Sequence, residues 1–250
     1  MNLPSTRKDN EEISTSFGST YTTSPGLLAF GQQTNSEEVR VSFPPEDTSW
    51  RSIYSPEKSF RYIGIGVVNV YIGTMKFRDK SEAIPMVARV SLIDYRGRLL
   101  FDSYIRPTHL VEDYRQAQTG LSYDHLCNAP SFVDVQKRIA AYIQDKIIVG
   151  HRVWIFLAVL GLSHPALHTR DLALFRPMRK KLGSRVVVEL STLVKVFMAR
   201  DVGLQYEDSA EFSRAAMDLF RSCQEIFEDI ITAGQWPCDL PPERFAEHYS

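Results

Sequence analysis

Three acidic side chains lie close together at the start of an amphipathic segment: Glu207, Asp208 and Glu211. Carboxylate oxygens are the ligands that hard divalent cations such as Mg²⁺ prefer, and Glu207 and Glu211 would lie one turn apart if both were helical. Acidic residues in a first helical turn more often balance the helix dipole and face solvent. We favour this second interpretation over a metal site.

A second candidate segment, residues 147–157, is expected to be a buried strand that ends in Gly150-His151 and leads directly into a helix. A histidine can act as a base near neutral pH. No Asp or Glu lies between Asp145 and Asp171, so the sequence places no acidic partner beside His151. We therefore predict a hydrogen-bonded structural histidine rather than a catalytic base.

Two further features could form interaction surfaces. The helix expected at 153–160 is apolar all round, which predicts burial; the alternative is that Trp154 opens onto a cleft mouth and binds a protein partner. The one dense basic run, expected in a loop, could contact phosphates of RNA, although we favour a solvated loop because the net charge is only -1. This run consists of Arg176, Arg179, Lys180, Lys181 and Arg185.

Composition limits the class of protein. The 250 residues, 44% of them hydrophobic, are enough for one sizeable core, and a net charge of -1 gives no general attraction for nucleic acid. The three cysteines, Cys127, Cys223 and Cys238, lack the spacing of a disulfide framework or a metal site, which predicts a reducing, intracellular compartment. No apolar run approaches the ~20 residues needed to cross a bilayer, so we expect no membrane contact.

The chain divides into three parts by composition. Residues 1–57 are rich in Ser, Thr, Gly, Pro and acids without sustained periodicity, which predicts a disordered arm. Residues 58–234 carry the patterns of a folded domain. Prolines at 237, 241 and 242 predict an irregular C-terminal tail over 235–250.

The folded part begins with a three-stranded meander and then alternates helices with strands. Strands are expected at 62–70, 87–95, 99–105, 147–149 and 172–175. Helices are expected after an N-cap at Ser131 and at 153–160, 188–199 and 209–231. This order predicts an α/β fold with a mixed sheet and helices on both faces.

Nine short phrases spread over about 60–231 accompany this order of elements: Ala88–Arg98, Tyr104–Thr108, Asp113–Arg115, Thr119–Leu121, Asn128–Phe132, Val149–His151, Leu160–Pro165, Arg170–Asp171 and Arg214–Met217. Together with the order of elements, they resemble the DEDDh branch of the ribonuclease H-like 3′→5′ exonucleases. They are most similar to the nucleolar RNA exonuclease and interferon-stimulated exonuclease subgroup. The resemblance implies a ribonuclease H-like five-stranded mixed sheet and a nuclear location. It also implies acidic side chains that hold a pair of Mg²⁺ or Mn²⁺ ions and a histidine that activates water.

The positions that correspond to those catalytic residues hold other side chains. The resemblance places the first Asp and Glu at Gly66 and Val68, the second Asp at Phe156, and the His and last Asp at Glu207 and Phe212. Clustered carboxylates repel one another unless a cation neutralises them, whereas Gly and apolar residues can fill the same space. We therefore predict an apolar plug in place of a metal site, with no catalytic residue, no metal and no cofactor.

We accordingly predict a catalytically inactive relative of the exonucleases, a pseudo-enzyme that acts as a protein-interaction or RNA-binding module. A protein partner is favoured over RNA because the charge balance is poor for nucleic acid. No small-molecule cofactor is expected. The alternative is an active 3′→5′ exonuclease on RNA or single-stranded DNA, which would need Mg²⁺ or Mn²⁺.

Overall fold

A computed structural model describes residues 60–77 and 80–249, so the arm predicted at 1–57 lies outside the described residues. The described part contains a five-stranded sheet in the order β3-β2-β1-β4-β5. The strands are β1 (Tyr62–Phe77), β2 (Lys80–Asp94), β3 (Leu99–Tyr104), β4 (Ile147–Gly150) and β5 (Thr169–Asp171). Because β1, β2 and β3 pair antiparallel while β1, β4 and β5 pair parallel, the sheet is mixed.

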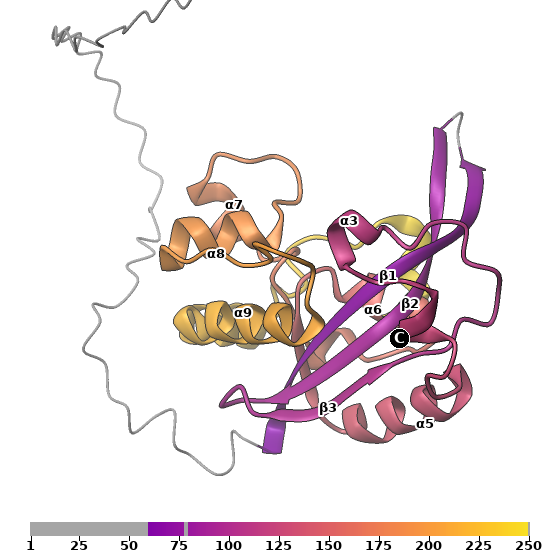
Figure 1. The fold of residues 1–250 in the computed structure, drawn as a ribbon. Helices are drawn as coiled ribbons and strands as arrows, with labels where there is room; N and C mark the ends of the chain where they lie inside the picture. The colour runs from indigo at the N-terminus through magenta and orange to yellow at the C-terminus, as the bar shows by residue number, and fades with distance from the viewer. Residues whose placement is uncertain (1–59, 78–79, 250) are drawn as a thin grey trace, which may run out of the picture. The chain divides into compact units, whose positions relative to one another are not determined.

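β1 extends well beyond the apolar run that predicts it. Its pairing with β2 starts at Ile63 opposite Asp94 and is shifted twice, between Val68 and Asn69 and again just after Tyr71. Irregularities of this kind bend a strand and increase its twist. Beyond them the β1–β2 hairpin projects from the rest of the described fold (Figure 1).

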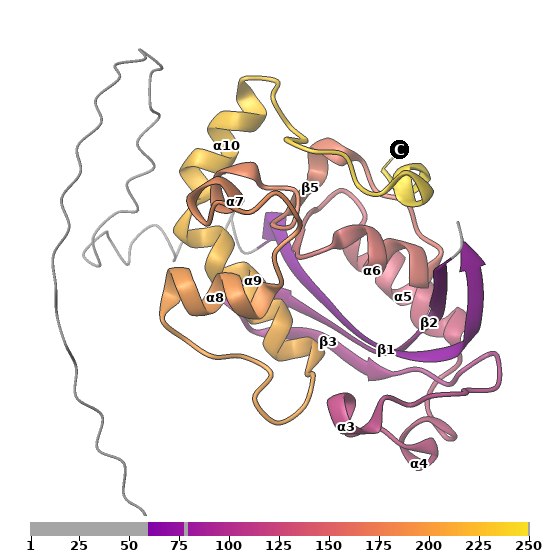
Figure 2. The same ribbon diagram turned by 90° about the horizontal axis from the view of Figure 1, so that it is seen from above.

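Helices cover both faces of the sheet (Figure 2). On one face, α5 (Phe132–Ile143) and α6 (Val153–Leu160) bury a cluster that includes Ile63 and Ile65 of β1. On the other face, α9 (Ser209–Ser222) packs on β1 and β2, with α8 (Leu190–Met198) and α10 (Gln224–Thr232) beside it. The remaining elements are α3 (Gln116–Thr119), α4 (Tyr123–Leu126), η1 (Ala166–His168), α7 (Arg176–Lys181) and η2 (Glu243–His248). The predicted α/β fold is confirmed.

The start of α5 follows its sequence signal. The Ser131 side chain accepts a hydrogen bond from the backbone N–H of Asp134 at 3.2 Å and donates one to the Asp134 carboxylate at 2.6 Å. This satisfies one of the free N–H groups at the helix start. Val135, Ile139 and Ile143 then recur on one face and are buried against the sheet.

Three predicted elements differ from the structure. The last strand lies at 169–171, and residues 172–175, although buried, follow it without extending it. The helix predicted over 209–231 is interrupted at Cys223, whose backbone angles (φ -129°, ψ 16°) are not helical. The basic run begins in α7 rather than in a loop, and a proline in the first turn suits a helix start.

The C-terminal tail returns to the fold instead of leaving it. The predicted irregular tail contains η2, and the backbone oxygen of His248 accepts the N–H of His164 at 2.9 Å. Trp236 is buried and its ring centroid lies 4.7 Å from that of Phe227 in α10. Across residues 60–77 and 80–249, we find no helix with the length and apolar character that a membrane span requires.

Candidate functional site

Gly66 lies on β1 directly beneath α9. A Cβ atom at this position would lie 2.3 Å from the backbone oxygen of Ser209 and 2.6 Å from Oγ of Ser213. The backbone of a packed helix cannot move aside as the end of a flexible side chain can. The place where the resemblance expects the first carboxylate is therefore filled by α9.

Serine hydroxyls join α9 to β2 beside Gly66. Oγ of Ser91 lies 2.6 Å from Oγ of Ser209, and Ser213 donates to the Ser209 backbone oxygen at 2.6 Å. Ser91 also donates to the carboxylate of Asp102 at 2.7 Å. The three serines are fully buried, and burial is tolerated because each hydroxyl has a partner. Sequence reasoning missed this contact; its only local signal is the small side chain at these positions.

Of the three apolar positions of the resemblance, Val68 and Phe156 are buried and Phe212 is partly buried, and they do not form one plug. Val68 packs in a cluster with Leu121, whereas Phe156 belongs to the cluster between α5, α6 and the sheet. Phe212 packs against the third cluster, on the α9 side, and its ring adjoins Gly203. The predicted single plug is therefore replaced by three separate packing sites.

Glu207, where the resemblance expects a histidine, is held by Arg115. Nη1 of Arg115 donates to Glu207 Oε2 at 3.0 Å and to the backbone oxygen of Asn69 at 3.1 Å, and Nη2 donates to the other Glu207 oxygen. Arg115 thereby ties β1 to the segment before α9. Glu207 lies outside α9, so Glu207 and Glu211 are not one helical turn apart. The Glu211 carboxylate instead accepts the backbone N–H of Gly203 at 3.0 Å.

Asp208 caps α9 and binds a second arginine. Its Oδ1 accepts the backbone N–H of Glu211 at 2.7 Å, and its Oδ2 accepts Nη1 of Arg89 at 2.6 Å. Arg89 also donates twice to Asp102, at 3.0 and 2.7 Å. Burial alone would raise the pKa of Asp102, but hydrogen bonds from Arg89 and Ser91 outweigh it and hold that pKa below its usual range. Asp208 thus has the role at a helix start that was favoured from the sequence, and it also forms an ion pair with Arg89.

The pair of divalent cations that the resemblance implies does not fit the residues at the expected positions. Gly66, Val68, Phe156 and Phe212 have no side-chain oxygen, and the Glu207 carboxylate is held by an arginine. Within residues 60–77 and 80–249, no three His, Cys, Asp or Glu side chains come together in a way that could hold a metal ion. The described residues at these positions therefore do not form a two-metal site.

Asp171, at the end of β5 and part of the phrase Arg170–Asp171 that helps to carry the resemblance, is a fully buried carboxylate. It accepts the backbone N–H groups of Arg152 at 2.9 Å, Val153 at 2.7 Å and Ala173 at 2.9 Å, and the hydroxyl of Tyr249 at 3.0 Å. The first two N–H groups begin α6, so Asp171 caps that helix from a neighbouring strand. Burial raises the pKa of Asp171 to about 6, although the hydrogen bonds favour its charged form.

His151 has the structural role that the sequence predicts: its Nε2 lies 2.7 Å from the backbone oxygen of Val188. Burial lowers the pKa of His151 to about 4. An unfolded chain takes up this proton near pH ~6.5, so the stability that depends on neutral His151 should fall as pH drops from about 6.5 to 4. We expect NMR titration of the folded protein to show a neutral ring down to pH 5; a midpoint above pH 6 would contradict this.

Trp154 does not open onto a cleft. It is 4% exposed and packs with Leu172 and Phe175 in the cluster on the α9 side of the sheet. The apolar character of α6 on all sides thus reflects burial, as favoured from the sequence. Trp154 is therefore not available as a contact for a protein partner.

The basic run is divided between internal pairs and solvent. Arg176 and Arg179 both pair with Asp239 of the C-terminal tail, and the Arg179 side chain is largely covered. Nζ of Lys181 lies 5.4 Å from the ring centroid of Phe197. Lys180 and Arg185 are exposed. Only part of the predicted patch therefore presents free surface.

Sequence similarity to known proteins shows the family of this chain. Residues 72–165 match the exonuclease family RNase_T. RNA exonuclease 4 of Candida glabrata is 34% identical over 198 residues, which are 79% of this chain and 73% of that protein. The chain belongs to this exonuclease family. RNA exonuclease 4 of Neurospora crassa is 37% identical over 59% of the chain, and that of Mycosarcoma maydis is 37% identical over 68% of the chain. The chain spans only 36% and 44% of the length of those two relatives.

Solved structures share the fold of this exonuclease-family chain. The Saccharomyces cerevisiae PAN2 pseudoubiquitin-hydrolase-RNase module matches with a TM-score of 0.57 and 20% identity, over 82% of this chain and 35% of the other. The Pan2 module in complex with AAGGAA RNA matches with a TM-score of 0.58 and 18% identity, over 72% and 32%. The described domain thus has the ribonuclease H-like exonuclease fold.

These relatives contradict the prediction of a catalytically inactive protein. Proteins named RNA exonuclease 4 match most of the folded part, and the exonuclease family match lies within it. The prediction was drawn from five positions, 66, 68, 156, 207 and 212, whereas the similarity to the Candida glabrata protein extends over 198 residues. The active exonuclease, given above as the alternative, fits the comparisons better.

Proposed function

We propose that this chain is a 3′→5′ exonuclease that acts on RNA, in the manner that the name RNA exonuclease 4 implies for its relatives. The observation that carries the proposal is the 34% identity with the Candida glabrata protein over 73% of its length. A match of this extent covers the scaffold that would bind and orient a strand end. The RNA complex of a structural neighbour supports RNA as the substrate class.

The structure adds a condition to this proposal. The described side chains at 66, 68, 156 and 212 supply no oxygen ligands, so a cation that serves hydrolysis must be held by other groups. What the described residues supply near the start of α9 are two guanidinium groups, Arg89 and Arg115, each engaged by carboxylates of this chain. A phosphate of an incoming strand would compete with Asp208 and Glu207 for these donors. We propose that these two arginines bind the RNA backbone.

Incubation of the full chain with 5′-labelled single-stranded RNA and DNA tests the proposed function. We expect stepwise loss of nucleotides from the 3′ end of RNA in Mg²⁺ or Mn²⁺. EDTA should stop the reaction because it removes the cations that neutralise the negative charge on the phosphodiester during hydrolysis. Arg115→Ala should slow the reaction roughly tenfold or more, the effect of losing one charged hydrogen bond.

Two controls make this assay decisive. RNA with a blocked 3′ end should resist digestion, and a contaminating nuclease would digest equally well in the Arg115→Ala preparation. RNA that stays intact with both cations would overturn the proposal, and so would digestion that is insensitive to EDTA and to the variant.

A further inference from the structure

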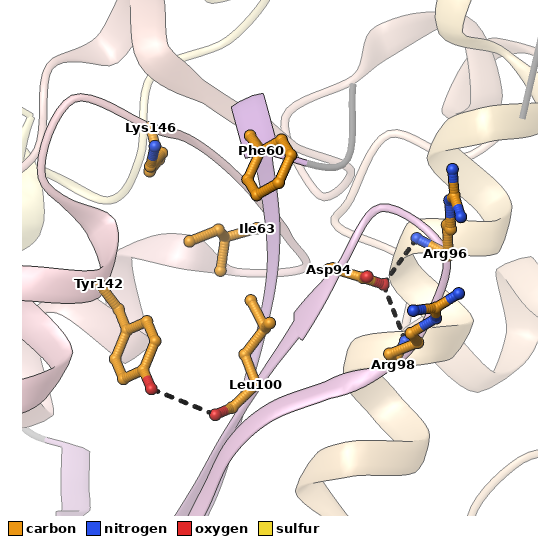
Figure 3. A pocket seen from close by; sticks show the side chains of 8 residues that line it. All are labelled: Phe60, Ile63, Asp94, Arg96, Arg98, Leu100, Tyr142 and Lys146. Atoms are coloured by element: carbon orange, nitrogen blue, oxygen red, sulfur yellow. Dashed lines mark hydrogen bonds between the residues drawn. The ribbon is translucent and has the colours of Figure 1, made fainter. Parts of the chain in front are cut away.

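A hollow of about 510 Å³ opens at the start of β1, between the β2–β3 turn and the end of α5 (Figure 3). Ile63 of β1 lines it, three residues before Gly66, which places the two about 10 Å apart along the strand. An odd spacing puts two strand residues on opposite faces of the sheet, and Ile63 belongs to the cluster with α5 and α6. The hollow is therefore separate from the region where α9 covers β1.

One part of the lining is aromatic and aliphatic. Phe60 is 74% exposed and Leu100 is 39% exposed, so both leave apolar surface uncovered. The Tyr142 ring is fixed because its hydroxyl donates to the backbone oxygen of Leu100 at 3.3 Å and its centroid lies 5.9 Å from that of Phe101. Held rings with an open side are surfaces on which nucleobases stack without regard to sequence.

The rest of the lining is cationic. Arg96 and Arg98 lie on one side and Lys146 on the other, with Phe60 between them (Figure 3). Among the described residues, neither Arg98 nor Lys146 makes an ion pair with a carboxylate. A lining that combines such cations with apolar rings fits a flat organic anion.

The one acidic group in the lining, Asp94, offsets only part of the charge of its three cationic side chains. Oδ1 of Asp94 accepts the backbone N–H groups of Arg96 at 2.8 Å and Arg98 at 2.9 Å, which holds the β2–β3 turn. Asp94 is only 9% exposed. The carboxylate thus serves the turn, while the side chain of Arg98 remains exposed for an anion.

We propose that this hollow binds a nucleoside monophosphate group, with the base against Tyr142 and Phe60 and the phosphate between Arg98 and Lys146. The choice of a nucleotide over other flat anions rests on the proposed function, because an exonuclease meets nucleotides both as product and within its substrate. A free mononucleotide and an unpaired nucleotide of an RNA strand share this chemistry. The hollow accepts either, and the two sources are separated by experiment.

The test measures binding of AMP by calorimetry and of a labelled single-stranded RNA by anisotropy, with the full chain in fixed salt and EDTA. We expect Arg98→Glu combined with Lys146→Glu to weaken binding about tenfold or more, because phosphate contacts are replaced by repulsion. Lys137→Glu, a charge reversal at an exposed position of α5 outside the hollow, should change affinity less than about twofold. Tyr142→Ala should also weaken binding, whereas Tyr142→Phe keeps the ring and its contact with Phe101 and should retain most of the affinity.

Each outcome decides the proposal. Loss of AMP binding in the double variant supports a free mononucleotide, and loss of RNA binding alone supports a nucleotide within a strand. Wild-type protein that binds neither ligand, or a double variant that binds both as well as Lys137→Glu does, would overturn the inference. Exonuclease assays on the same preparations keep the two proposals apart, since AMP binding in a protein without nuclease activity would overturn only the proposed function.

Discussion

Replacement of Asp171 by alanine is expected to lower the free energy of unfolding by about 3 to 5 kcal/mol. The change leaves the backbone N–H groups of Arg152, Val153 and Ala173 buried without the acceptor that they use in the folded protein. Each buried donor that loses its partner costs about 1 to 3 kcal/mol, and relaxation of the start of α6 recovers part of the sum. Chemical denaturation at pH 7, followed by circular dichroism, measures the effect.

Tyr249→Phe is the matched control for Asp171→Ala. It removes one of the four hydrogen bonds to the carboxylate and leaves the three backbone donors satisfied. Its expected cost is about 1 kcal/mol, the usual net value of one hydrogen bond. Equal costs for the two variants would show that Asp171 does not hold the start of α6.

Gly66→Ala is expected to lower the free energy of unfolding by about 1 to 3 kcal/mol, the range found when a packed core is overfilled. The added Cβ would meet the backbone oxygen of Ser209 at 2.3 Å, so β1 and α9 must separate. Loss of this contact also strains the hydrogen bond between Ser91 and Ser209. Thermal and chemical unfolding of the purified variant measure the change.

Gly64→Ala provides a comparison on the same strand and face. Its Cβ would lie 2.6 Å from Cγ1 and 2.9 Å from Cδ1 of Ile93, which are side-chain atoms, whereas the nearest backbone atom, the Ser213 oxygen, lies at 3.3 Å instead of the 2.3 Å found at Gly66. The gain from a less flexible unfolded chain is the same for both substitutions, so it cancels in the comparison. A cost for Gly66→Ala no greater than that for Gly64→Ala would contradict the close approach of α9.

Sequence similarity shows the family of this chain, whereas hydrolysis depends on a few individual side chains. The similarity to RNA exonuclease 4 extends over strands, helices and turns, which is why it establishes the family. Hydrolysis depends on a few oxygen ligands, and positions 66, 68, 156 and 212 hold none. The EDTA-sensitive digestion assay measures this second property directly, and the Gly66→Ala comparison measures the packing that fills the first of these positions.

Local patterns were enough to predict much of the fold. The apolar run at 62–70 predicted the central strand, the serine at 131 predicted the start of α5, and the all-round apolar helix at 153–160 predicted its own burial. These features depend on neighbours within a few residues, because the periodicity of side chains and the capping of a helix are local properties. The family resemblance likewise came from short phrases in order.

The sequence by itself therefore determined the fold class, the family and the absence of side-chain oxygens at four expected site positions. Only the tertiary structure decided that α9 fills the space beside Gly66, that Arg115 holds Glu207, that Asp171 caps α6 and that Asp239 pairs with the basic run. These pairs join residues far apart in the chain, such as Arg115 and Glu207, which are separated by 92 positions. Contacts at such separations form when the sheet brings its helices together, and they leave no mark on local periodicity.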